Sequence, residues 1–325
     1  MRRLRANILW SLVIGTCVGL LGLEIGLRIH FRDDYGLANY RDWHFKRNWS
    51  DRFVERNALG HRDHEFSRAK PAGTFRILAL GDALAFGEGV ESIDDLYTAI
   101  LERQLNTSRE PRTYEVINVA EIGWEIDDYL AALRDPGLSY APDLLLLALY
   151  INDVEDRRVR RPKPPPLLPE RLLGETLHRA LLKASFLYWY SVKPYEQHKY
   201  EEFWLDFVDG YTRPDSQHWA RFVPIYQELL ETCRDNDLPV LVVIFPYLVA
   251  WDAEHPFAPV YQRMAEIAER GGATALDLLP RLLVHDIWRL RAGVSRWLPS
   301  ERAHRIVAGE IEQRLWETGL LRDVN

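Results

Sequence analysis

Short apolar runs alternate with longer amphipathic segments from residue 75 onward. Apolar runs of strand length lie at 76–80, 114–119, 144–150, 239–245 and 273–278. Segments with helical spacing of apolar residues lie at 92–105, 125–134, 217–235, 257–270 and 302–317. Continuous apolar runs are typical of parallel strands buried on both faces, and the helices between them indicate right-handed crossovers. The pattern therefore predicts an α/β fold: a parallel sheet of about five strands with helices on both faces, and a functional site at the carboxyl edge of the strands.

The N-terminus has the pattern of a membrane anchor. Arg2, Arg3 and Arg5 precede an uncharged run, 8–23, after which Glu24 interrupts and apolar residues resume to position 27. The whole stretch from 8 to 27 is long enough to cross a bilayer core. Because no small-x-small cleavage site follows, we favour an uncleaved signal anchor over a cleavable signal peptide. The arginines hold the N-terminus in the cytoplasm. We therefore expect a single-pass protein of the cytoplasmic (inner) membrane whose C-terminal domain is extracytoplasmic, in the periplasm.

These patterns divide the chain into three parts. We expect a cytoplasmic tip and signal anchor at 1–28, a juxtamembrane lead-in at 29–74 and the α/β domain at 75–325. An insertion at 157–200 separates the third and fourth strands. It begins with a basic, proline-rich connector that cannot form a helix or a central strand, and continues with helical apolar spacing and an aromatic cluster at 186–190. We expect the insertion to lie near the site or near the membrane.

Composition excludes several classes of function. A net charge of −7 over 325 residues provides no basic surface for nucleic acid. The histidines show no metal-ligand spacing, and the glycines at 81, 87 and 89 lack the lysine of a phosphate-binding loop. We therefore predict no metal, no cofactor and no nucleic-acid partner.

The first strand ends in a recognisable motif, Gly81-Asp82-Ala83. It resembles the first signature block of the SGNH (GDSL-type) hydrolases, in which Gly-Asp-Ser presents the nucleophile. The serine position is occupied by Ala83. The resemblance covers roughly 75–315 and implies the flavodoxin-like SGNH fold. Membrane-anchored proteins of this type carry an element similar to residues 57–63, Asn-Ala-Leu-Gly-His-Arg-Asp, which we interpret as a turn in the lead-in.

Two further blocks retain the residues that the family uses to stabilise an oxyanion. Gly123 follows the second strand, at the position whose N–H contributes to the oxyanion hole. Asn152-Asp153 follows the third strand, and the family's asparagine donates to the same oxyanion. The resemblance thus implies an oxyanion-hole-like pair, Gly123 and Asn152, and a surrounding pocket. We expect that pocket to be formed by Asp82, Ala83, Asp153 and Trp297.

The fourth block has lost the family's catalytic residues. Pro299 and His304 hold the register of the family's Asp-x-His-Pro block, which places Arg296 at the aspartate and Leu298 at the histidine. His304 itself lies outside the triad. A serine nucleophile needs a hydroxyl, a base and a group that orients the base. Ala83, Leu298 and Arg296 supply none of these, so we predict no catalytic residue of the Ser-His-Asp type.

Three functions remain as hypotheses. The first is a membrane-anchored extracytoplasmic SGNH-like pseudoenzyme that binds or scaffolds, with an envelope glycan or an envelope-assembly protein as its partner. The second is an active esterase or acyltransferase on acylated glycans or lipids with a relocated nucleophile, for which Ser295, Ser300 and the pair His285-Asp286 are candidates. The third is a purely structural membrane-tethered domain whose pocket is filled by Trp297 and Leu298.

Overall fold

The computed structural model describes residues 2–30, 49–107, 112–156, 165–206, 209–252, 254–292 and 298–321. The chain forms two compact units. One contains Met1–Arg52 and Lys163–Phe203, and it holds the N-terminal helix and a helical insertion. The other contains Phe53–Pro162 and Trp204–Asn325, and it holds the sheet.

The sheet confirms the predicted fold class. Its strands are β1 (Thr74–Gly81), β2 (Thr113–Ala120), β3 (Leu144–Leu149), β4 (Val240–Ile244) and β5 (Thr274–Asp277). They are all parallel, in the order β2-β1-β3-β4-β5. This is the doubly wound order in which the switch point lies between the first and third strands. Because β3 and β4 are buried along their whole length, they form the centre of the core.

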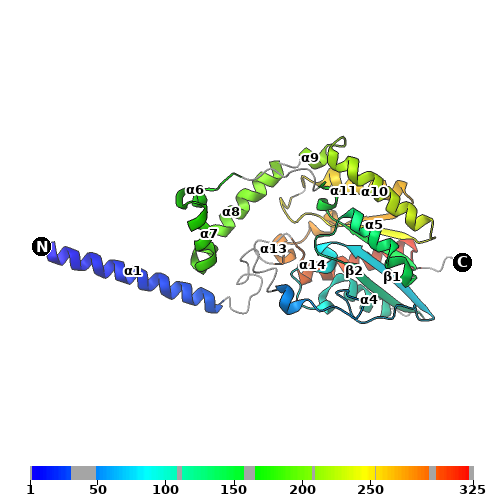
Figure 1. The fold of residues 1–325 in the computed structure, drawn as a ribbon, viewed down its shortest axis with the longest axis horizontal. Coiled ribbons are helices and arrows are strands. Elements are labelled where there is room, and N and C mark those ends of the chain that lie inside the picture. Colours follow the sequence, from blue (N-terminus) through cyan, green and yellow to red (C-terminus); the bar gives the residue numbers. More distant parts are fainter. Residues whose placement is uncertain are drawn as a thin grey trace. The chain divides into compact units, whose positions relative to one another are not determined.

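Helices cover both faces of the sheet (Figure 1). On one face α4 (Tyr97–Thr107) packs against α14 (Glu301–Thr318), and on the other α5 (Ile126–Arg134) packs against α10 (Gln217–Arg234), beside α11 (Ala258–Arg270). Shorter helices are α3 (Ala83–Phe86), α9 (Asp209–Thr212), α12 (Leu279–Leu282) and α13 (Ile287–Leu290). Three 3₁₀ turns complete the described elements of this unit: η1 (Ile93–Asp95), η2 (Gly137–Tyr140) and η3 (Ile151–Val154).

One predicted helix begins later than its pattern indicates. The segment predicted from residue 92 starts with η1, which is capped by the Ser92 hydroxyl accepting from Asp94 N, and α4 follows only from Tyr97. A serine that accepts the first free N–H groups favours a short turn as readily as a long helix.

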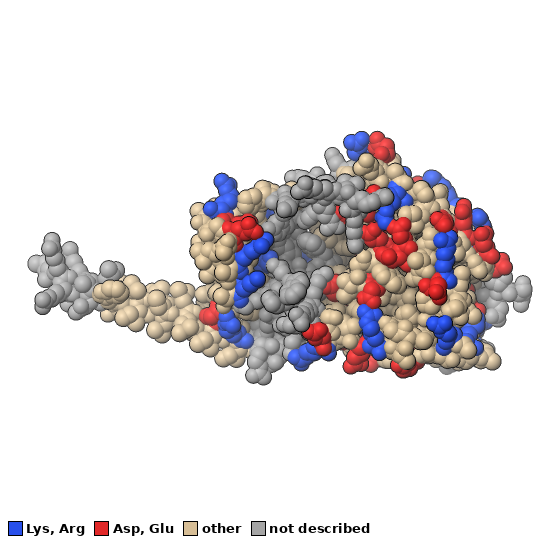
Figure 2. Space-filling model, in the orientation of Figure 1, with Lys and Arg blue, Asp and Glu red and all other residues tan. Residues whose placement is uncertain are grey.

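The other unit contains the membrane-anchor pattern. Its first helix, α1 (Arg2–His30), includes a 20-residue stretch, Trp10–Ile29, that is long and apolar enough to cross a membrane, with a mean hydropathy of 1.8 and none of it buried. Figure 2 shows that most of its described surface carries no charged side chain. The helical spacing predicted within 157–200 corresponds to α6 (Leu168–Leu173), α7 (Glu175–Ala184) and α8 (Phe186–Asp206). Most of the proline-rich connector, 157–164, lies outside the described residues.

Candidate functional site

The predicted nucleophile position lies at the carboxyl end of β1. Gly81 closes the strand, and a Cβ there would lie 2.7 Å from the Ala85 Cβ, so only glycine fits. Asp82 caps α3, because its Oδ1 accepts from Leu84 N at 2.9 Å. Ala83 is the first residue of α3 and is partly exposed, between the buried residues Asp82 and Leu84. The turn therefore presents a methyl group where the resemblance expects a hydroxyl.

Asn152 is brought to this turn from the end of β3. It lies in η3, and its Nδ2 donates to Asp82 Oδ2 at 3.1 Å across 70 residues of sequence. Its Oδ1 is buried and has no partner among the described residues. One of the two amide hydrogens of Asn152 is thus committed to Asp82. The other amide hydrogen could be donated to an oxyanion or to a carbonyl oxygen.

Asp153 faces the interior of the domain. Its side chain is fully buried, with Oδ1 accepting from the Tyr129 hydroxyl and Oδ2 from Tyr150 N, each at 2.7 Å. Burial and the nearby Asp82 carboxylate raise the pKa of Asp153 well above its usual value. Burial also raises the pKa of Asp82. We interpret Asp153 as a residue that fixes the loop after β3, and it contributes no exposed group to the predicted pocket.

Gly123 lies beyond the end of β2 and is exposed. Its φ of +88° lies in the left-handed region, although a Cβ there would meet nothing within 4 Å. The backbone angle, not the available space, therefore selects glycine at this position. The structure places Ala83, Gly123 and Asn152 in the segments that directly follow three adjacent parallel strands, at one edge of the sheet.

The fourth block is only partly described. Ser295, Arg296 and Trp297 lie outside the described residues. Leu298 is half-buried, its carbonyl accepts from Ala292 N at 2.8 Å, and the next residue, Pro299, bridges Arg291. An alkyl side chain therefore occupies the predicted position of the catalytic base.

His304 is used structurally. Its ring is buried, Nδ1 accepts from Tyr97 N at 3.0 Å, and the ring stacks on that of Tyr97 with centroids 5.8 Å apart. Burial, assisted by the charge of Arg62, lowers the pKa of His304 to about 3. The imidazole is neutral at physiological pH, and its accepting nitrogen is already occupied.

The candidates for a relocated triad have structural partners as well. The Ser300 hydroxyl donates to Arg289 O at 2.8 Å and caps α14 by accepting from Ala303 N. Asp286 caps α13 by accepting from Trp288 N at 3.0 Å. A hydroxyl and a carboxylate that close helix ends are poorly placed to exchange protons with a substrate. Within the described ranges, no group of three or more His, Cys, Asp or Glu side chains could hold a metal ion.

The loop after the predicted nucleophile position is held by Arg62, an arginine of the 57–63 element whose burial was not predicted from the sequence. Arg62 is fully buried, with Nη1 donating to Phe86 O at 2.7 Å and to Gly87 O at 2.8 Å, and Nη2 donating to Val90 O at 2.6 Å. Its neighbour Asp63 accepts from Asn118 N in β2 at 2.9 Å. The 57–63 turn is therefore bonded to the loop after β1 and to β2. Burial and the nearby Arg56 lower the pKa of Arg62 to about 10.

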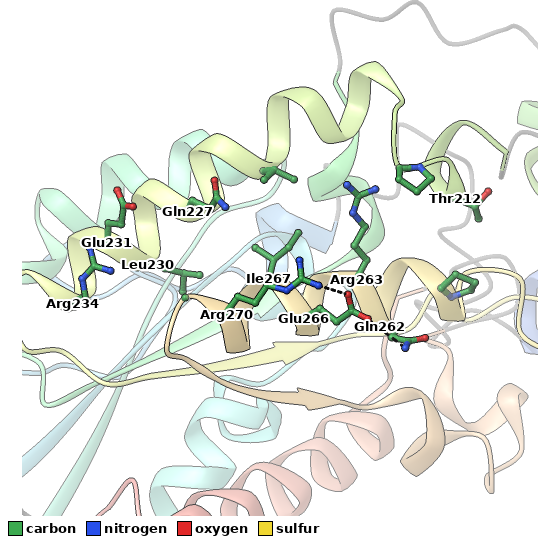
Figure 3. Close-up of a pocket in the computed structure, with 14 residues that line it drawn as sticks. Thr212, Gln227, Leu230, Glu231, Arg234, Gln262, Arg263, Glu266, Ile267 and Arg270 are labelled. Carbon is green, nitrogen blue, oxygen red and sulfur yellow. Dashed lines mark hydrogen bonds and ion pairs between the residues drawn. The ribbon is translucent and has the colours of Figure 1, made fainter.

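A pocket of about 710 Å³ lies elsewhere, between α10 and α11 (Figure 3). Its lining includes Gln227, Glu231, Arg263 and an ion pair between Arg270 and Glu266. The lining residues fall within 212–234 and 259–271, so none of them belongs to the predicted site.

Comparison with known proteins finds similarity at the level of structure. No protein-family model matches the chain, and no curated protein matches it. Similar solved structures include a putative lipolytic protein of the G-D-S-L family from Desulfitobacterium hafniense (12% identity, 73% of this chain and 98% of that one, TM-score 0.44). Others are a lipase/acylhydrolase from Enterococcus faecalis (12%, 75% and 96%, 0.47) and a catalytic mutant of an acetylxylan esterase from Geobacillus stearothermophilus (15%, 77% and 97%, 0.47). Similarities at this level say nothing about the activity of this chain.

The fold assignment follows from the chain's own topology. The strand order is β2-β1-β3-β4-β5, with Gly81-Asp82 closing the first strand, Gly123 after the second and Asn152-Asp153 after the third. The chain therefore has the fold of the SGNH hydrolases, the superfamily that its sequence resembles.

Proposed function

We propose that this protein is a membrane-anchored, non-hydrolytic SGNH domain that binds an acyl ester at the carboxyl edge of its sheet. The observation that carries the proposal is Ala83, the partly exposed first residue of α3, which presents a methyl group at the nucleophile position. Acyl transfer through an SGNH site begins with a serine oxygen that loses its proton to a base. Ala83 has no oxygen, and the half-buried Leu298 at the base position accepts no proton.

The groups that remain suit recognition better than catalysis. Asn152 keeps one amide hydrogen beyond its bond to Asp82, and Gly123 is exposed beside the same sheet edge. Two such donors fit the carbonyl oxygen of an ester. We take an acylated envelope glycan as the ligand class, because α1 anchors the domain in our proposal and the basic residues in its first turns direct the domain out of the cytoplasm.

The purified full-length protein in detergent will not hydrolyse short-chain nitrophenyl esters above the rate of buffer. The single substitution Ala83→Ser will not introduce hydrolysis, because no base lies at position 298. Release of nitrophenol measures both. Turnover that disappears in His285→Ala or Ser300→Ala would refute the proposal and establish the esterase with a relocated triad.

An O-acetylated oligosaccharide will raise the melting temperature of the full-length protein, whereas the deacetylated sugar will not. A ligand at 100 times its Kd adds about 2.7 kcal/mol to the folded state, a shift that melting detects easily. Asn152→Ala will abolish the shift, and Gln227→Ala, in the separate pocket between α10 and α11, will retain it. A wild-type melting temperature that neither sugar shifts would contradict the binding proposal and favour the purely structural role.

A further inference from the structure

The helical insertion reverses the usual distribution of polar and apolar side chains. The exposed fractions of its leucines reach 54% at Leu168, 74% at Leu172 and 49% at Leu177. In α7 the one buried residue is a histidine, His178. Exposed apolar patches and buried polar groups are the informative departures from ordinary globular packing. They indicate that α6 and α7 present leucines to surroundings other than water.

Contacts between buried polar side chains hold α7 and α8 together as a helical hairpin. His178 Nε2 lies 2.8 Å from a carboxylate oxygen of Glu196, and its Nδ1 lies 2.9 Å from the Tyr188 hydroxyl. The side chains of His178 and Glu196 are only 6% and 3% exposed. Because both ring nitrogens have partners, the hairpin is held from inside by polar contacts, and the leucines outside it remain available for another surface.

The same hairpin is clamped to α1 by one carboxylate. Glu24 accepts from Phe186 N and Leu187 N, each at 2.8 Å, and from the Ser185 hydroxyl at 3.0 Å. Its charge therefore caps the N-terminus of α8, where free N–H groups favour an anion. Arg28 pairs with Glu24 at 2.6 Å and donates to the carbonyl of Ala184, the last residue of α7.

Apolar contacts beside the clamp reinforce it. Phe186 and Trp189 are buried together, and Leu27 of α1 and Leu182 of α7 pack against them. The carboxylate that interrupts the apolar run of α1 is therefore the point at which the insertion is attached.

The position of the clamp on α1 identifies the surface that the leucines meet. Arg5 and Glu24 bracket the uncharged run of α1 and are 19 residues apart, which in a helix is about 28 Å, close to the ~30 Å of a bilayer core. A helix that spans the membrane with Arg5 at one boundary has Glu24 at the other. The turn between α7 and α8, fixed to Glu24, then lies at that boundary.

We propose that α6 and α7 lie in the membrane interface, with the leucines at 168, 172, 173 and 177 buried among lipid acyl chains. This inference rests on the membrane anchoring in the proposed function. Short helices with leucines on the lipid side and basic residues such as Arg179 and Lys183 near the head groups bind in this way. The insertion would then fix the orientation of α1 and the height at which the chain leaves the bilayer.

Nitroxide labels on the full-length protein will test the proposal. In a C17A/C233A background, L172C and L177C supply the predicted lipid-facing sites, and R179C supplies a matched polar site on α7. The protein is reconstituted in phosphatidylethanolamine and phosphatidylglycerol vesicles, and flotation first establishes that it is anchored. We expect labels at 172 and 177 to collide several-fold more with oxygen, relative to a water-soluble nickel complex, than the label at 179.

Each other result overturns a defined part of the proposal. If the protein is anchored but the labels at 172 and 177 collide with the nickel complex as often as the label at 179 does, the leucines do not contact lipid and the proposal is overturned. Labels shielded from both reagents show that a protein, a second copy or a partner, covers the leucines instead. A protein that fails to float overturns the anchoring itself. Glu24→Leu should stay anchored and lose the oxygen preference at 172, and an unchanged preference would overturn the role of the clamp.

Discussion

Replacing Arg62 by methionine will lower the free energy of unfolding by about 3–5 kcal/mol, because three buried carbonyls lose their donor at ~1–3 kcal/mol each while the cost of burying a charge is relieved. The three acceptors are those of Phe86, Gly87 and Val90, in the loop after the first strand. Methionine fills a similar volume without providing a donor. In a domain of this size the melting temperature should fall by roughly 10 °C.

Two variants make the Arg62 experiment specific. Arg62→Lys keeps the charge but replaces the planar guanidinium, which donates from several nitrogens, by a single ammonium group. Its free energy of unfolding should therefore fall by an intermediate amount. Arg134→Met removes an exposed arginine whose pair with Glu228 is half open to solvent on both sides, and it should change stability by less than about 1 kcal/mol. Melting of the full-length proteins in one detergent compares all three. A fall for Arg62→Met no larger than that for Arg134→Met would refute the structural role of Arg62.

The elements that the sequence predicted best are those whose pattern is local. The leucine run that forms β3 is apolar at every position, and a segment buried on both faces of a sheet needs no more information than this. The place of Ala83 directly after the first strand was also predictable, because Gly81-Asp82-Ala83 follows the apolar run of that strand. The strand order agrees with the doubly wound topology that such alternation favours.

The contacts between segments far apart in the sequence were not predictable from local pattern. Glu24 interrupts an apolar run, but its partners in α8 lie about 162 residues further along the chain. Arg62 belongs to the 57–63 element, which was predicted as a turn, but nothing in that pattern indicates that its guanidinium is fully buried. Asn152 and Asp82 are 70 residues apart and meet because their strands are adjacent in the sheet. Burial and long-range pairing follow from the packing of elements, which hydrophobic periodicity does not encode.

The second large effect concerns acid, and it arises at His304. Its pKa falls from 6.5 to about 3 in the folded chain, because the ring is buried and lies near the charge of Arg62. Between these values the unfolded chain binds a proton that the folded chain does not, so stability is full above pH 6.5 and is lost as pH falls toward 3. The loss approaches about 1.4 kcal/mol per pH unit. His304 Nδ1 now accepts a hydrogen bond from Tyr97 N. Protonation would put a hydrogen on Nδ1, so that two N–H groups would face each other.

His304→Asn isolates this effect, because an asparagine oxygen can still accept from Tyr97 N but does not titrate. The variant should lose a constant amount of stability from the missing ring stack, and the wild-type advantage over it should shrink as pH falls below 6.5. The opposite contribution of Asp63, whose pKa burial raises to about 7, stabilises the fold as pH falls and is common to both proteins, so it cancels in the difference. His198→Asn, at a side chain that is 68% exposed, provides the matched control. Melting curves from about pH 7.5 to about pH 4.5 give the comparison, and a wild-type advantage that stays constant across that range would show that His304 does not carry the acid sensitivity.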